Sequence, residues 1–320
     1  MVVRNITALS ILEGYFIYTS EDRWAGALVS GECLLGLLML LSVIIGCYRI
    51  PILKKSPFGT LMANQNLAQL IACTNSGVFF FLGVLLDIKS IIKHSNIFGN
   101  LSIFLIPTIL GSFLLMSVNR FCASMFPFYY SLLFSRRFVK IYIIANWLLP
   151  IIPTVVLMVF LDCNFVFYHF GWLFTGAPMD QNQKCGTSLV YYAMYIQLTL
   201  SVMIFIIDVI TLLRLTFARS TIYQHHTAEN RRREITFASQ VLIQGAIFIM
   251  HGFWYDLGYG WIPGDSEKWK IFFTTSFSSN LLHVIDPLIV FIFNIEFRKR
   301  IICKKTSNKS TIVSAIGLPS

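Results

Sequence analysis

Charged side chains are scarce in this chain. Asp, Glu, Lys and Arg make up 12% of its 320 residues, hydrophobic residues make up 56%, and the mean hydropathy is +0.70. Soluble proteins carry about 25% charged residues. The shortage of charge therefore excludes a soluble globular protein and indicates a membrane protein. Negative charges are scarcer than positive ones, with 15 Asp and Glu against 25 Lys and Arg.

Long apolar runs are what the chain has in place of charge. A spanning helix needs about 20 mostly apolar residues, because the hydrocarbon core is roughly 30 Å thick and a helix rises about 1.5 Å per residue. Seven such runs predict an all-α fold, a bundle of seven transmembrane helices over residues 28–48, 58–86, 97–118, 141–161, 186–213, 235–255 and 271–293. The expected organisation is an N-terminal segment at 1–27, a membrane domain at 28–300 and a C-terminal tail at 301–320. Prolines inside the predicted helices, Pro107 among them, are expected to bend the helices and favour a cavity.

The positive charges are distributed unevenly between the two faces of the predicted bundle. The segments after the first, third and fifth helices and the C-terminal tail hold 18 of the 25 Lys and Arg, and the opposite face holds 7. The positive-inside rule then places the N-terminus outside and the C-terminus in the cytoplasm. Anionic lipid accounts for the net charge of +10, so no nucleic-acid partner is predicted. The first 27 residues lack the features of a cleaved signal peptide, and we expect the first helix to act as a signal anchor.

Three covalent modifications are predicted at the ends of the chain and in one outer loop. Asn5 begins a glycosylation sequon on the predicted outer side. Cys163 and Cys185 both lie between helices four and five, where an oxidising exterior permits a disulfide worth roughly 3 kcal/mol that stiffens a hairpin lid. Cys303 follows a basic amphipathic stretch at 297–302 that is expected to form a short helix along the inner leaflet. Palmitoylation of Cys303 and a free reduced thiol are both open.

Two motifs end the predicted third and seventh helices. Asn119-Arg120-Phe121-Cys122-Ala123, followed by Pro127 and Tyr130, resembles the segment that ends helix three in rhodopsin-type G-protein-coupled receptors. Asp286-Pro287-Leu288-Ile289-Val290, followed by Asn294 and Phe297-Arg298, resembles the segment that ends helix seven in the same receptors. Arg231-Arg232-Arg233-Glu234-Ile235 before helix six adds a similarity to nematode serpentine chemoreceptors, class x above all.

The resemblance implies a function as well as a fold. It implies a chemosensory receptor that binds a small molecule, an odorant or a metabolite, within the bundle and activates a heterotrimeric G protein. Arg120 and the Arg231, Arg232 and Arg233 cluster are then expected to face the G protein. The implied location is the plasma membrane of sensory neurons, in their cilia, with membrane lipid as the other partner.

The chain departs from the receptor pattern in informative places. The acid that usually precedes the arginine is replaced by Asn119, so the usual adjacent ion pair is absent and higher basal activity is a hypothesis. Val290 stands where the family has a tyrosine. Asp286 costs roughly 2.5–3.5 kcal/mol to place in lipid and is expected to face the interior. Pro287 beside it is expected to loosen the helix for a movement.

The outer parts of the chain are short, so a ligand is expected to enter the bundle. The predicted lining combines one carboxylate with aromatic and amide side chains, and its members are Glu32, Pro107, Tyr191, Tyr195, Trp254, Tyr255 and Asn280. Mostly apolar and aromatic walls indicate a small, largely hydrophobic or weakly polar ligand. Each of these residues is equally compatible with helix packing.

Other classes of membrane protein remain as alternatives. An opsin is excluded, because residues 271–293 contain no lysine for retinal. A ligand-gated channel or transporter is the main alternative, although no span carries a polar stripe. A membrane-embedded metal hydrolase would need more than His251 and His283 at one depth, so no metal, cofactor or catalytic residue is predicted.

Overall fold

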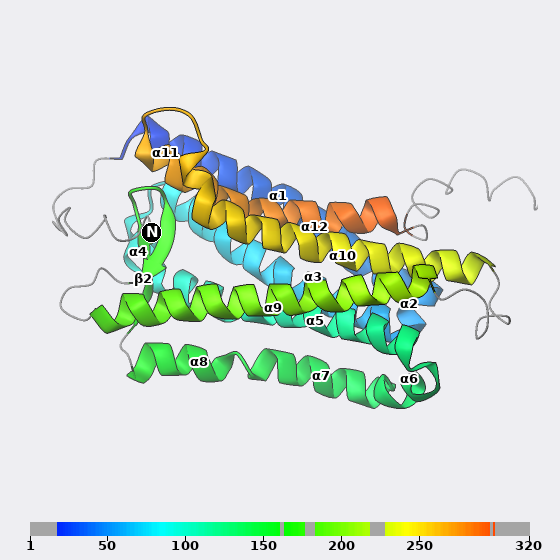
Figure 1. Cartoon of the computed structure of the whole chain (residues 1–320). Coiled ribbons are helices and arrows are strands. Elements are labelled where there is room, and N and C mark those ends of the chain that lie inside the picture. Colours follow the sequence, from blue (N-terminus) through cyan, green and yellow to red (C-terminus); the bar gives the residue numbers. More distant parts are fainter. Residues whose placement is uncertain (1–17, 161–162, 177–182, 218–227, 295–296, 298–320) are drawn as a thin grey trace, which may run out of the picture.

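The fold is a bundle of long helices with a small hairpin at one end (Figure 1). The computed structural model describes residues 18–160, 163–176, 183–217, 228–294 and 297, with backbone alone for 183–194 and 228–234. Seven of the helices in this part of the chain are long and apolar enough to cross a membrane, which confirms the predicted number of spans. The predicted orientation of the termini stays a prediction.

Six of the seven spans are longer than the apolar runs that predicted them, and the second has the same length. They are formed by α1 (Ser20–Arg49), α3 with η2 (Pro57–Val78 and Phe79–Leu85), α5 (Ser95–Met125), α7 with α8 and η3 (Arg136–Leu148, Ile151–Val155 and Val156–Phe160), α9 (Gln183–Phe217), α10 (Ala228–Leu257) with η4 (Gly258–Gly260), and α11 with η5 and α12 (Glu267–Phe272, Phe273–Phe277 and Ser278–Phe293). Short helices connect them: α2 (Pro51–Lys55), α4 (Lys89–Lys93) and α6 (Pro127–Leu133).

Proline affects these helices in two ways. α5 continues through Pro107 and α12 continues through Pro287. The fourth span is instead interrupted between α7 and α8, where Leu149 and Pro150 form a turn. Proline removes a backbone hydrogen bond and crowds the preceding turn, which explains the break.

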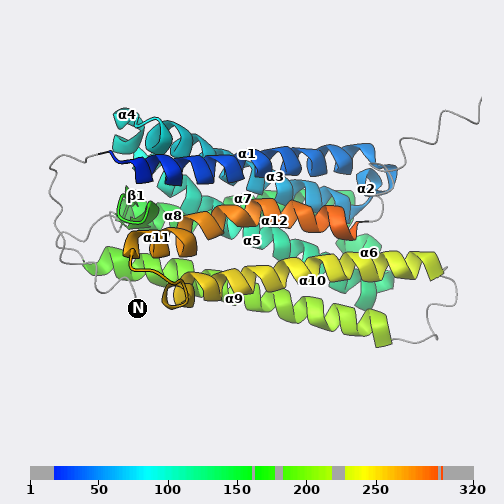
Figure 2. The ribbon, with the colours of Figure 1, turned by 90° about the horizontal axis from the view of Figure 1, so that it is seen from above.

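The two ends of the bundle differ. α4, α11 and the strands β1 (Phe165–Tyr168) and β2 (Leu173–Gly176) lie at one end, named here the hairpin end (Figures 1 and 2). α2 and α6 lie at the other end, named here the Arg120 end (Figures 1 and 2). The strands pair antiparallel, with Phe165 opposite Gly176 and Tyr168 opposite Leu173.

Packing inside the bundle is mostly apolar. α1 packs on α3 and α12, α5 packs on α3 and α9, and α10 packs on α9 and α12. One cluster of buried side chains, including Phe58, Met116 and Val290, lies toward the Arg120 end. A second cluster, including Phe79 and Trp172, lies at the hairpin end. Outward-facing apolar side chains such as Leu34, at 62% exposed, suit a surface in contact with lipid rather than water.

Candidate functional site

The hairpin is fixed to the third span by a polar contact and a close approach. Asn100 of α5 accepts a hydrogen bond from the backbone N–H of Phe165 at 2.9 Å and donates one to Asn164 at 3.1 Å. A methyl group at Gly99 would overlap the carbonyl oxygen of Phe165, so glycine permits this approach. Cys163, just before β1, is disulfide-bonded. The base of the hairpin is therefore held firmly on α5.

The aromatic face of the hairpin packs on η2. The ring of Phe79 lies 4.9 Å from the ring of Phe167 and 4.8 Å from the ring of Phe174, measured between centroids. These distances are within the range of favourable aromatic pairs. β1 and β2 therefore form a hairpin over this end of the bundle, which agrees with the hairpin predicted for this loop (Figure 1).

Trp172, the last residue of the hairpin turn, points into the bundle. Its side chain is fully buried, and its indole N–H donates to Oδ1 of Asp22 at 2.7 Å. Nζ of Lys268 lies 3.9 Å from its ring centroid, and the Trp269 ring lies 4.9 Å away. The hydroxyl of Ser276 donates to its carbonyl oxygen at 2.6 Å. Trp172 thus connects the hairpin to α1, α11 and η5.

Asp22 is the polar centre of this end of the bundle. Its Oδ2 accepts from the backbone N–H and the hydroxyl of Thr19 at 2.7 and 2.8 Å, which caps α1. Its Oδ1 lies 2.6 Å from Nε2 of His169 and 3.6 Å from Nζ of Lys268. Burial lowers the pKa of His169 from 6.5 to about 4, against the opposing effect of the Asp22 carboxylate. His169 is accordingly neutral at neutral pH and in close contact with the Asp22 carboxylate.

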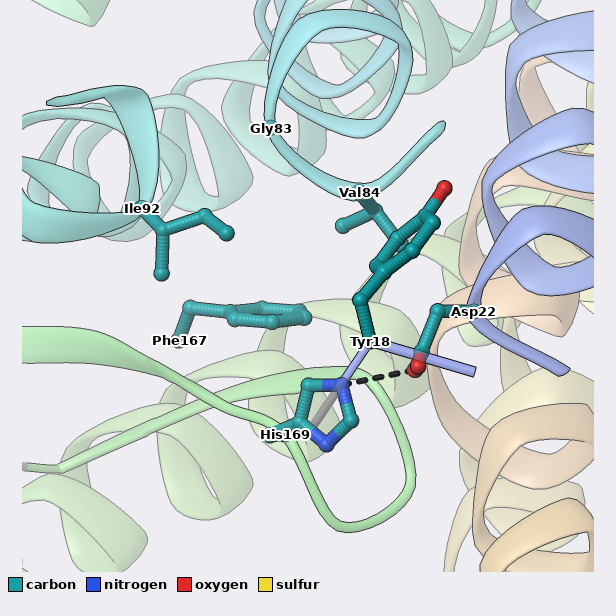
Figure 3. A pocket seen from close by; sticks show the side chains of 7 residues that line it. All are labelled: Tyr18, Asp22, Gly83, Val84, Ile92, Phe167 and His169. Carbon is teal, nitrogen blue, oxygen red and sulfur yellow. Dashed lines mark ion pairs between the residues drawn. The ribbon is translucent and has the colours of Figure 1, made fainter. Parts of the chain in front are cut away.

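A small pocket adjoins Asp22 and His169 (Figure 3). Tyr18, Ile92 and Phe167 contribute to its walls. Its lining mixes aromatic and aliphatic side chains with one carboxylate and one imidazole.

Glu32 and Asn280, two predicted ligand residues, belong to neighbouring helices. Asn280 is buried on α12, accepts a long hydrogen bond from the thiol of Cys33 at 3.5 Å, and donates to the carbonyl of Ser276 at 2.7 Å. Both carboxylate oxygens of Glu32 are shielded from solvent and have no hydrogen-bond donor among the described residues. Glu32 is thus a buried acceptor one residue before the cysteine that contacts Asn280.

The other predicted ligand residues are spread more widely. Trp254 is half-buried and donates to the carbonyl of Phe273 at 3.2 Å, and Pro107 is half-buried on α5. Tyr195 and Tyr255 are 60% and 43% exposed, so the structure places them on the outside of the bundle rather than in a pocket. The side chain of Tyr191 lies outside the described part of the chain.

Asp286 lies in the interior of the bundle, as predicted from the free-energy cost of placing a carboxylate in lipid. It is 3% exposed, and its carboxylate accepts three side-chain amide donors. Gln65 donates to Oδ2 at 2.6 Å, Gln69 to Oδ2 at 3.0 Å, and Gln244 to Oδ1 at 2.7 Å. The first two amides come from α3 and the third from α10, so one carboxylate of α12 connects three helices. Pro287 follows it within α12.

Arg120 is buried at the opposite end from the hairpin. Its guanidinium carbon lies 3.7 Å from the ring centroid of Phe58 and 4.8 Å from that of Phe237. Cation–π contacts at such distances stabilise by about 0.5–2 kcal/mol. Asn119 beside it is fully buried and donates to the hydroxyl of Tyr130 at 3.1 Å. The arginine is thus held between aromatic rings of α3 and α10.

The remaining residues of the predicted switch lie nearby or outside the described side chains. Phe121 is half-buried, with its ring 6.0 Å from that of Phe126, and Pro127 begins α6. The side chains of Arg231, Arg232, Arg233 and Cys185 lie outside the described part of the chain, as do Asn5, Cys303 and the predicted helix after the seventh span. The pairing of Cys163 with Cys185 therefore stays a prediction.

Comparison with known proteins gives consistent matches over nearly the whole chain. The family model described as "Serpentine type 7TM GPCR chemoreceptor Srx" matches residues 32–294. Serpentine receptor class X-43 of Caenorhabditis elegans is 56% identical over 299 residues, which cover 93% of this chain and 92% of the relative. Serpentine receptor class X 45 of the same organism is 23% identical, over 87% of this chain and 80% of the relative.

A solved structure with the same arrangement of helices is squid rhodopsin. It superposes with a TM-score of 0.69 at 13% sequence identity, over 92% of this chain and 83% of the rhodopsin. This likeness concerns the fold. Together with the relatives, it supports a receptor of the G-protein-coupled type rather than an enzyme.

Proposed function

The chain belongs to the Srx family of serpentine seven-transmembrane chemoreceptors, and from that premise we propose that it detects a small molecule and activates a heterotrimeric G protein. The ligand binds toward the hairpin end of the bundle, and the G protein binds at the Arg120 end. The receptor resides in the plasma membrane of sensory neurons, in their cilia.

The observation that carries the proposal is the Asp286 carboxylate with its three amide donors. A receptor must have two packings of one bundle, and a ligand shifts the balance only by its different affinity for each. Hydrogen bonds from Gln65, Gln69 and Gln244 join α3, α10 and α12. Neutral amides can exchange partners around a carboxylate with small movements, so this network suits a change in helix packing better than purely apolar contacts do.

The proposed G-protein surface is built around Arg120 and the arginine cluster that begins α10. Arg120 is 7% exposed in this packing, so its guanidinium must leave the rings of Phe58 and Phe237 to reach a partner. A planar group with five donors can exchange ring contacts for carboxylate or carbonyl oxygens. Arg231, Arg232 and Arg233 add positive charge to the same proposed surface.

The test is intracellular calcium in cells that express the chain with a promiscuous G-protein α subunit. A panel of small odorants and water-soluble metabolites is applied to the wild type, to Arg120→Ala and to Arg49→Ala. Arg49 is exposed in the last turn of α1, so its replacement removes the same charge without removing a buried contact.

G-protein coupling would be supported if the wild type and Arg49→Ala respond while Arg120→Ala, at equal surface expression, does not. Responses that survive both Arg120→Ala and inhibition of G proteins would contradict the proposal and favour a ligand-gated channel.

A further inference from the structure

The space that the Trp172 side chain fills, named here the chamber, is lined by groups that suit an indole ring. Resting on the proposed receptor function, we propose that Trp172 is a tethered occupant of a ligand site, and that the ligand is a neutral planar heteroaromatic with an N–H donor that displaces it. The chemical class is that of indole. The site lies between the start of α1, the hairpin turn and α11 with η5.

The chamber contacts both the edge and the faces of the ring. Oδ1 of Asp22 accepts the ring N–H at 2.7 Å, and Nζ of Lys268 lies over a ring face at 3.9 Å from the centroid. Trp269 and Phe272 enclose the ring, with centroids 4.9 and 5.4 Å away. A free heteroaromatic ligand with an N–H donor would require the same groups, namely a carboxylate at the ring edge, a cation over the ring face and aromatic walls.

The charges around Asp22 favour a neutral ligand over an amine. Lys268 lies 3.6 Å and His169 2.6 Å from the same oxygen that accepts the indole N–H, and Thr19 satisfies the other oxygen. The carboxylate is therefore already compensated, and an ammonium group would meet the charge of Lys268. A ring without an N–H would leave Oδ1 short of one donor in a buried site, which is costly.

The backbone of Trp172 indicates that this residue is held by its side chain. Its φ is +50°, in the left-handed region that a bulky residue rarely adopts, and it follows Gly171 at +90°. Such a conformation persists only where surrounding contacts outweigh its cost. Loss of the side-chain contacts to a competing ring would allow the turn to relax, which favours displacement.

The contacts at the base of the hairpin confine that movement to the hairpin turn. The base of the hairpin is held by Asn100 and by the disulfide of Cys163, so only the turn at residues 169–172 has to move. Asp22 and His169 also line a small pocket with Tyr18 and Phe167 (Figure 3). Displacement would also break the bond from Ser276 to the Trp172 carbonyl, which gives the ligand different contacts in the two packings.

The first experiment measures thermal unfolding of the purified full chain with and without indole. In Trp172→Gly the chamber is emptied, and glycine adopts a positive φ without strain. We expect indole to raise the unfolding midpoint of this variant, with at least tenfold tighter binding than 1-methylindole, which has no N–H. Trp172→Gly with Asp22→Asn should lose that tenfold preference. Trp261→Gly, which removes a Trp that is 69% exposed near the same end, should gain no stabilisation.

The second measurement uses the wild type and does not depend on the folding of a variant. Indole should bind it at least tenfold more weakly than it binds Trp172→Gly, because the tethered ring competes. At saturating indole, the amide hydrogen of Trp172, which is bonded to the His169 carbonyl at 3.2 Å, should exchange faster with solvent. Equal binding of indole and 1-methylindole by Trp172→Gly, or unchanged exchange in the wild type, would overturn the proposal.

Neither measurement requires a G protein, so the two proposals fail separately. Calcium responses to other small molecules in a chain that binds no indole would refute the indole site alone. Indole binding with the expected N–H preference, in a chain that never signals, would confirm the site and count against the proposed coupling.

Discussion

Replacing Gln244 with Leu is expected to destabilise the folded bundle by about 1.5 kcal/mol. The change removes the donor that lies 2.7 Å from Oδ1 of Asp286. Gln244 and Asp286 are 1% and 3% exposed, so water cannot replace the lost bond. Hydrogen bonds to charged groups contribute about 1.5–3 kcal/mol, and bonds between membrane helices at most about 1.7 kcal/mol. The overlap of these ranges gives the estimate, which is about a tenfold change in the folding equilibrium.

Gln240, one turn earlier on α10, provides the matched control. It is fully buried, but within the described part of the chain its amide makes only long contacts, 3.5 Å to Gln244 and 3.9 Å to the sulfur of Met62. Its carbonyl oxygen has no donor among the described residues. Gln240→Leu therefore removes an unsatisfied carbonyl and one long hydrogen bond, and we expect a smaller loss of stability than in Gln244→Leu.

The assay for both variants is thermal unfolding of the purified chain with a dye that fluoresces on reacting with thiols. Cys33, Cys47 and Cys73 are free and buried, so they react as the bundle opens. Equal losses in Gln244→Leu and Gln240→Leu, or no loss in Gln244→Leu, would refute the idea that Asp286 makes a bond of this strength to α10.

The other predictions concern the two ends of the bundle. Phe58→Leu should lower the unfolding midpoint more than Phe237→Leu, because the Arg120 guanidinium lies 3.7 Å from the Phe58 ring and 4.8 Å from the Phe237 ring. The difference between the two variants should vanish when Arg120 is also replaced with Met. A difference that persists in that background would exclude a cation–π origin. Burial lowers the pKa of His169 from 6.5 to about 4. Between pH 4 and 6.5 the unfolded state therefore binds more protons than the folded state. The stability that neutral His169 contributes is complete above pH 6.5 and is lost as the pH falls toward 4. Asp22, Asp87 and Lys268 supply the neighbouring charges. The wild-type midpoint should therefore fall more than that of His169→Gln between these pH values, and parallel pH curves would contradict the assignment.

The number of spans follows from the sequence, but their ends do not. Hydropathy marks where apolar side chains begin, and the first run begins at residue 28, whereas α1 begins at Ser20. The extra turns contain Asp22, whose carboxylate caps the helix and accepts the indole N–H of Trp172. A polar residue at a helix start cannot be told from a loop residue until its distant partners are known.

The candidate site was predictable only where a local motif pointed to it. Asp286 and Arg120 stand in short motifs, and both are buried at the expected parts of their helices. Trp172 and Asp22 are 150 residues apart, and their contact depends on a hairpin turn with two positive φ values. Tyr195 and Tyr255 lie on the outside because helices that are apolar on all sides give no signal for which face is inward.

The replacement of the usual acid by Asn119 bears on how the resting bundle is held. Because the adjacent acid is absent, a weakly restrained Arg120 and higher basal activity were a hypothesis from the sequence. The structure places Asn119 against Tyr130 and places the guanidinium over the rings of Phe58 and Phe237, which belong to α3 and α10. Arg120 therefore still connects α5 to both neighbouring helices, through ring contacts that a change of pH does not alter. A restraint of about 0.5–2 kcal/mol per contact is comparable to the differences that shift a two-state receptor tenfold. The loss of an acid next to the arginine consequently does not by itself imply a constitutively active receptor.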